Sequence, residues 1–119
     1  MHVTPGAIII GAVGLGLIVV LALCARGVIP RGWAVGIRLP ALQQSDATWR
    51  AGHAAALVPY AVFAVVGALL ALSPLVFPSV ADWAPLLTTV TVVVGLILGS
   101  VRGVSAANKA AAKDDASRG

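Results

Sequence analysis

The chain has 119 residues, of which 60% are hydrophobic and 10% charged, and its mean hydropathy is +1.02. A water-soluble domain of this size could not bury so much apolar surface, because a small domain has a large surface for its volume. The formal net charge of +4 comes from basic residues beside apolar runs, and only 5% of residues are aromatic, so no nucleic-acid partner is expected. We therefore predict one integral membrane domain without a separate soluble catalytic module.

The first apolar run covers residues 7–25, about the length that an α-helix needs to cross a hydrocarbon layer of roughly 30 Å. No Lys or Arg precedes it, so it lacks the basic segment of a cleaved signal peptide and is expected to remain as a membrane span. Its cysteine, Cys24, is the single one in the chain. We interpret it as a small apolar side chain, since it has no cysteine to pair with.

Two further apolar runs cover residues 54–77 and 84–101, with a short proline-containing turn between them. The predicted fold class is therefore all-α, a three-helix transmembrane bundle over residues 1–103. The tail, residues 104–119, is expected to prolong the third helix for a turn or two before fraying. The threonines of the third run are expected to donate their hydroxyl protons to nearby backbone carbonyls.

Basic residues alternate with the apolar runs. None precedes the first run, four lie in the loop at residues 26–53, none separates the second run from the third, and four follow residue 101. The positive-inside rule then places both basic segments in the cytoplasm and the amino terminus outside. Anionic lipid headgroups are an expected partner of these segments.

Glycines spaced four residues from another small residue occur in every run, and such rows let helix backbones approach closely. The main pair is Gly95 with Gly99, and Gly11, Gly67 and Gly16 each have an alanine four residues away. Two interpretations remain open. The rows can pack the three helices of the chain together, or they can dock a second copy or another membrane protein.

The three runs contain no Asp, Glu, Lys or Arg, and a proton relay or ion path normally needs such groups, so transport by this chain alone is not expected. The residues with distinctive chemistry lie in the loop at 26–53. Gly36 and Pro40 exclude a regular helix around Arg38, which is therefore displayed from a stiff, extended stretch. Ser45 is expected to cap a short interfacial helix that runs into the second span.

Five residues of this loop are candidates for contact with a partner or a lipid headgroup: Arg38, Asp46, Trp49, Arg50 and His53. Asp46 and Arg50 lie four residues apart and are expected to pair, and Trp49 and His53 can touch for the same reason. Trp49 is expected to anchor the helix at the membrane interface. Arg38 can bind an anionic partner or a lipid phosphate, or it can pair with Asp46 or serve only to set the topology. For His53 the alternatives are a titrating switch or a hydrogen bond to a carbonyl or headgroup.

No catalytic site, metal site, cofactor or small-molecule substrate is predicted. Ser45, Asp46 and His53 do not form a hydrolase triad, because Ser45 is the expected helix cap and no strand-to-helix elbow is present. His2 and His53 are expected on opposite sides of the membrane, and Cys24 is remote from other metal ligands.

The motif residues of the loop are Gly36-Ile37-Arg38-Leu39-Pro40, then Ser45, Trp49-Arg50 and His53, directly before an apolar span. In order and spacing they resemble the SdpI family of bacterial membrane proteins, of which this chain looks like a short, three-helix form. The resemblance implies a non-enzymatic plasma-membrane protein that acts through protein–protein contact, in toxin immunity or in membrane signalling. The alternative is a small accessory subunit of a larger membrane complex, held by the face that carries Gly95 and Gly99.

Overall fold

A computed structural model describes residues 5–31, 36–37 and 39–118 of the chain. Its elements, in chain order, are α1 (Pro5–Ala25), α2 (Asp46–Leu72), the 3-10 helices η1 (Ser73–Leu75) and η2 (Pro78–Val80), and α3 (Ala84–Arg118). The described residues contain no strand, so the predicted all-α class is confirmed. Each of the three α-helices is long and apolar enough to cross a membrane.

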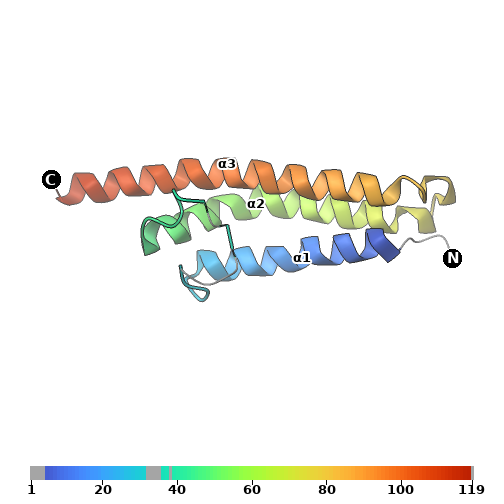
Figure 1. Cartoon of the computed structure of the whole chain (residues 1–119), viewed down its shortest axis with the longest axis horizontal. Coiled ribbons are helices and arrows are strands. Elements are labelled where there is room, and N and C mark those ends of the chain that lie inside the picture. Colours follow the sequence, from blue (N-terminus) through green and yellow to red (C-terminus); the bar gives the residue numbers. More distant parts are fainter. Residues whose placement is uncertain (1–4, 32–35, 38, 119) are drawn as a thin grey trace.

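The three helices lie side by side along the longest axis of the molecule (Figure 1). One end carries the start of α1 and the turn made by η1 and η2, and we call it the turn end. The opposite end, the loop end, carries the connection from α1 to α2, and α3 runs past it to Arg118. The molecule is 62 Å long, about twice the thickness of a bilayer's hydrocarbon core.

The second helix begins well before the predicted span at 54–77. The residues expected to form a short helix that runs into the second span are the first two turns of α2, continuous with that span. Ser45 caps α2 as predicted, since its hydroxyl oxygen accepts the Thr48 N–H at 3.1 Å. Thr48 Oγ1 accepts the Ser45 N–H at 2.9 Å in return, which completes a capping box and fixes where the helix starts.

The third helix is also longer than predicted. It continues to Arg118, about four turns beyond Gly103, so the expectation of only a turn or two was wrong. The tail is rich in alanine and lysine, which have high helix propensity. Ala107 is fully buried in the same apolar cluster as Leu42 and Trp49, so packing against the loop end holds the first turns of the tail in place.

Glycines let α3 lie directly against the backbone of α2. A Cβ atom added at Gly95 would overlap the Cβ of Phe63, and one added at Gly99 would lie 3.1 Å from the Ala56 carbonyl oxygen. At Gly103 an added Cβ would lie 2.9 Å from a carbonyl oxygen of α2. The face that carries Gly95 and Gly99 therefore packs within the chain, and it is not free to dock another protein.

The first helix packs mainly on α2. A Cβ at Gly11 would lie 3.3 Å from the Cβ of Ala71, and the Tyr60 hydroxyl donates a hydrogen bond of 2.8 Å to the Gly14 carbonyl oxygen. Gly67 of α2 faces α3, where an added Cβ would come within 3.0 Å of Val92. Gly11 and Gly67 thus join the helices of this chain, as one of the two interpretations held.

The threonines of α3 behave in two ways. Thr89 and Thr91 donate their hydroxyl protons to the carbonyls one turn earlier, each at 2.7 Å, as expected. For Thr88 the expectation was wrong, because its hydroxyl oxygen is buried and has no hydrogen-bond partner among the described residues. Thr88 is wholly buried, whereas Thr89 and Thr91 are partly exposed, so the Thr88 side chain packs inside the bundle.

The glycine contact predicts that Gly95→Ala lowers the free energy of unfolding by about 1–3 kcal/mol, because the new methyl group forces α3 away from Phe63. Gly16→Ala is the matched control, since a Cβ at Gly16 would meet nothing within 4 Å. Reversible unfolding of the purified variants in detergent micelles measures both changes. Equal stability of the two variants would contradict this account of the interface.

Candidate functional site

The loop end begins with a defined stop of α1. Gly27 has a positive φ of 79°, its N–H bonds to the Cys24 carbonyl at 3.1 Å, and the Val28 N–H bonds to the Leu23 carbonyl at 2.9 Å. This pair of bonds is the Schellman pattern, which ends a helix and turns the chain sharply. The segment that follows, residues 28–31, is thereby turned back toward the start of α2.

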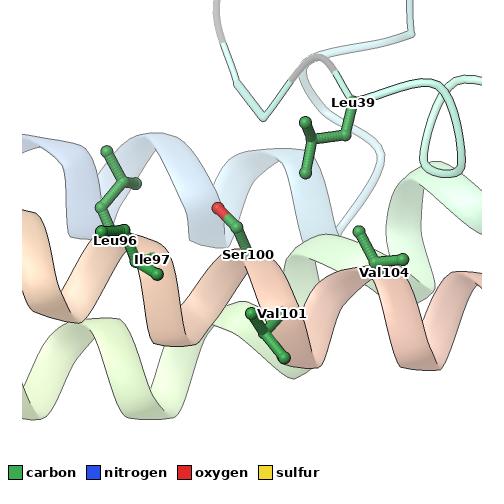
Figure 2. Close-up of a pocket in the computed structure, with 6 residues that line it drawn as sticks. All are labelled: Leu39, Leu96, Ile97, Ser100, Val101 and Val104. Atoms are coloured by element: carbon green, nitrogen blue, oxygen red, sulfur yellow. The ribbon is translucent and has the colours of Figure 1, made fainter.

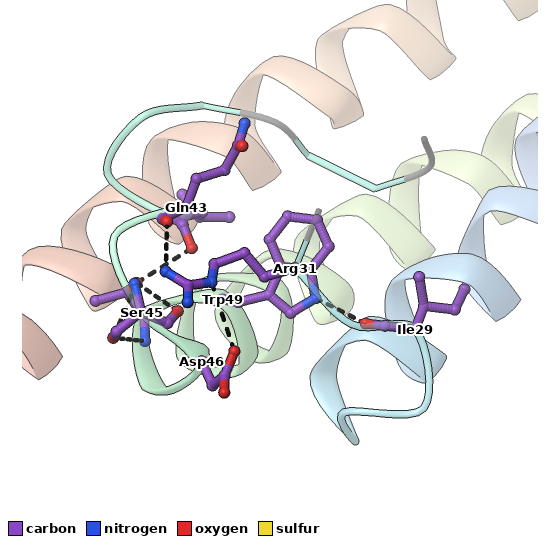
Figure 3. Close-up of polar contacts among 8 residues, drawn as sticks. Ile29, Arg31, Gln43, Ser45, Asp46 and Trp49 are labelled. Carbon is purple, nitrogen blue, oxygen red and sulfur yellow. Dashed lines mark hydrogen bonds and ion pairs between the residues drawn. The ribbon is translucent and has the colours of Figure 1, made fainter. Parts of the chain in front are cut away.

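Trp49 of α2 holds this segment. Its indole Nε1–H donates a hydrogen bond of 2.9 Å to the Ile29 carbonyl oxygen (Figure 3). The side chain is only 1% exposed, so the protein itself surrounds the ring. The structure therefore gives Trp49 a place inside the chain instead of the interfacial anchor that the sequence predicted.

His53, one turn further along α2, binds the loop segment at residues 36–37. Its Nε2 accepts the Ile37 backbone N–H at 2.8 Å, and its Nδ1 lies 2.7 Å from the Trp49 carbonyl oxygen. A neutral ring protonated on Nδ1 satisfies both contacts, because Nε2 must accept while Nδ1 donates. The Trp49 and His53 ring centroids are 4.2 Å apart, which confirms the predicted contact between them. Since His53 is fully buried, contact with a headgroup is not open to it.

We call Trp49, His53 and the two backbone groups that they bind the clasp. It ties the chain before and after residues 32–35 to a single face of α2. Gly36 fits against it with a positive φ of 108°, and a Cβ there would lie 2.9 Å from the Trp49 ring and 3.0 Å from Cys24 Sγ. Cys24 is buried, as expected for a small apolar side chain.

The charged residues beside the clasp pair differently from the prediction. Asp46 lies 3.5 Å from Arg31, measured from Oδ1 to Nε, and no ion pair joins it to Arg50 among the residues that the structure describes. Arg31 is positioned by a second contact, a hydrogen bond of 3.0 Å from its guanidinium to the Gln43 carbonyl oxygen (Figure 3). The segment after α1 therefore brings in a partner for Asp46 that helical spacing could not identify. Asp46 and Arg50 are both exposed, and Arg38 lies outside the described residues.

The part of the loop that carries Leu39 borders an apolar hollow, which we call the Leu39 groove. Its outer part, about 490 Å³, lies between Leu39 and one face of α3 (Figure 2). Its inner part, about 260 Å³, reaches between α1 and α3 under the same residue. The α3 residues that line the outer part are Leu96, Ile97, Ser100, Val101 and Val104.

Several residues that shape this end were not singled out from the sequence. Arg31 and the carbonyl of Ile29 act through contacts 15 and 20 residues away in the chain, and nothing in the local pattern marks them. Gly27 could have been found, because a glycine just after an apolar helix commonly marks its C-terminus. Thr48 could have been found too, as the partner of Ser45 in a capping box.

The loop end combines apolar, charged and hydrogen-bonding side chains. The described residues include no group of three His, Cys, Asp or Glu side chains that could hold a metal ion. What they do offer is an apolar groove, a charged rim and a buried clasp that joins them. Three apolar helices with such a loop define a multi-pass membrane protein.

Comparison with protein families matches residues 28–102 to the SdpI/YfhL protein family. The match covers more than half of the chain, from the end of α1 to the last predicted membrane residues of α3, and the chain belongs to this family. Comparisons with curated proteins and with solved structures found no match.

The clasp predicts a local effect for His53→Ala. The Ile37 N–H would lose its acceptor, and an unpaired buried donor costs about 1–3 kcal/mol. We expect a lower free energy of unfolding together with faster hydrogen–deuterium exchange at residues 36–37. The control is Val58→Ala, an exposed position on the same helix. Unchanged exchange at Ile37 in the His53 variant would show that the clasp does not hold the loop.

Proposed function

We propose that the chain is a non-enzymatic membrane protein of the toxin-immunity or membrane-signalling type, which acts by holding an apolar helix of another polypeptide in the Leu39 groove. The groove is the observation that carries this proposal. Its outer part is open and almost wholly apolar, and every residue that lines this part except Val104 belongs to the stretch that matches the family.

The shape of the groove supports this proposal more than its hydrophobicity does. Exposed apolar side chains are ordinary in a membrane span, because lipid tails are as apolar as leucine. A concave surface is different, since it offers contacts on several sides to a group that fits into it. Ile97 and Val101 are 57% and 63% exposed, so the chain itself leaves this face of α3 uncovered, while Leu39 overhangs it (Figure 2).

Ser100 supports a polypeptide as the occupant. It lines both parts of the groove, and its hydroxyl makes no hydrogen bond within the described chain. Side-chain hydroxyls between membrane helices commonly bond across the interface. A partner helix with a small or polar residue at this depth would accept or donate such a bond, which an acyl chain cannot do.

The proposed orientation places the loop end in the cytoplasm of a bacterial cell and the turn end outside. Arg26, Arg31 and Arg50 lie at the loop end with Arg102 and the two lysines of the tail, and no Lys or Arg occurs in residues 51–101. This one-sided distribution is what the positive-inside rule relates to the cytoplasmic face.

A second candidate function, an accessory subunit of a larger complex, needs a surface other than the one first considered. Gly95 and Gly99 are covered by α2, whereas Ala12 and Gly16 of α1 are exposed and an added Cβ at Gly16 would meet no atom within 4 Å. This small-residue row is the face through which a neighbouring subunit's helix could approach α1 closely.

The proposed function is tested by filling the groove with a larger side chain. A deletion strain is challenged with a panel of membrane-active peptides, and resistance is restored with the wild type, with Ser100→Phe or with the control Val62→Phe, whose site is exposed on α2 away from the groove. We expect Ser100→Phe to lower the tolerated peptide concentration by about tenfold, the effect of about 1.4 kcal/mol in binding. Val62→Phe should protect like the wild type.

A photo-crosslinking residue at Ile97, compared with one at Val62, identifies the occupant in the same strains. A crosslink from Ile97 to a peptide of the panel indicates immunity, and a recurring crosslink to one membrane protein indicates signalling. A crosslink from Ala12, with a stoichiometric complex in mild detergent, would favour the accessory subunit. Full resistance of the deletion strain, with no crosslink specific to Ile97, would contradict both roles of the groove.

A further inference from the structure

We infer that a second hollow at the loop end, between Arg31 and Arg50, binds a phosphate group, either that of an anionic lipid headgroup or a free phosphate. This site is separate from the Leu39 groove, and it does not depend on the function proposed for that groove.

The hollow has a volume of about 170 Å³, and two segments far apart in the sequence form it. The residues that line it are Gly27, Pro30, Arg31, Asp46, Trp49 and Arg50. The aliphatic part of Arg50 lies over Gly27, where an added Cβ would be 3.3 Å from the arginine Cδ. Arg31 approaches from the opposite segment and is held there by the Gln43 carbonyl. Two arginines thus line one small space.

The charges in the hollow do not balance. Two arginines face one carboxylate, that of Asp46, whose side chain is 77% exposed and lies 3.5 Å from Arg31. Such an exposed pair compensates charge weakly. Arg50 has no carboxylate within 4 Å in the described part of the chain. The hollow also lies at the start of α2, where the helix dipole adds partial positive charge, so an anion is the ligand that complements it.

Phosphate suits this arrangement better than a simple halide does. The planar guanidinium donates two parallel hydrogen bonds to phosphate oxygens, and Arg31 still has N–H groups beyond the one that bonds Gln43. The net charge of the two arginines and Asp46 is +1, which matches a phosphodiester with its single negative charge. The hollow adjoins the end of α1, one of the helices that can cross the membrane, so lipid phosphates lie within reach.

Native mass spectrometry of the intact protein tests the site, with phosphatidylglycerol and phosphatidylethanolamine as probes. The wild type should retain phosphatidylglycerol preferentially. Arg50→Gln and Arg31→Gln should each lower its retention about fivefold, the effect of one basic residue at an anionic surface. Arg102→Gln is the charge-matched control, since Arg102 is exposed on α3 and does not line the hollow.

Asp46→Asn keeps the test valid if an arginine variant is unstable, because it removes the negative charge from the hollow and should raise phosphatidylglycerol retention. Inorganic phosphate, compared with chloride at equal ionic strength, separates the two sources. Displacement of the lipid by phosphate assigns the site to a soluble phosphate, and no displacement assigns it to the headgroup. Equal losses in Arg50→Gln and Arg102→Gln, or no gain in Asp46→Asn, would overturn the proposal.

Discussion

The close approach of α2 and α3 is the contact on which every other part of the molecule is built. In lipid there is little hydrophobic drive to bring two apolar helices together, so packing at short range must hold them. Gly95, Gly99 and Gly103 allow the two helices to approach this closely, because side chains there would collide with Phe63 or with backbone carbonyls of α2. Once these two helices are joined, they form the surface on which α1 and the loop are placed.

The first helix uses this surface only in part. It lies on α2, to which the Tyr60 hydroxyl ties it through the Gly14 carbonyl, and it leaves part of α3 uncovered toward the loop end. The Leu39 groove occupies that part. An apolar hollow therefore arises from unequal packing of three helices, without any charged residue inside the predicted spans.

One pair of side chains organises the whole loop end. Trp49 binds the loop segment that follows α1, through Ile29, and His53 binds the segment that leads to α2, through Ile37. The first segment places Arg31 at the charged hollow, and the second places Leu39 at the groove. Because both rings belong to the same helix and contact each other, the groove and the charged hollow are held in a fixed relation to the bundle.

Local sequence patterns were enough for the helices and for the start of α2. Apolar runs of sufficient length require helices in lipid, since each backbone polar group must then be satisfied within its own segment. Ser45 marked the start of α2 because capping acts over three residues. The third helix was predicted too short, and the second was predicted to end at residue 77 although α2 ends at Leu72. Hydropathy marks the stretch that suits lipid and does not mark where a helix ends.

The order of residues alone was sufficient to identify a three-helix membrane protein, with its family motif in the first loop and its basic residues beside the spans. What those residues touch became clear only from the folded chain. Asp46 pairs with Arg31 and not with Arg50, Trp49 is enclosed, and the Gly95 face meets α2. The difference is one of range, because capping and helix propensity act within a turn or two, whereas burial and ion pairing depend on segments that the fold brings together across the chain.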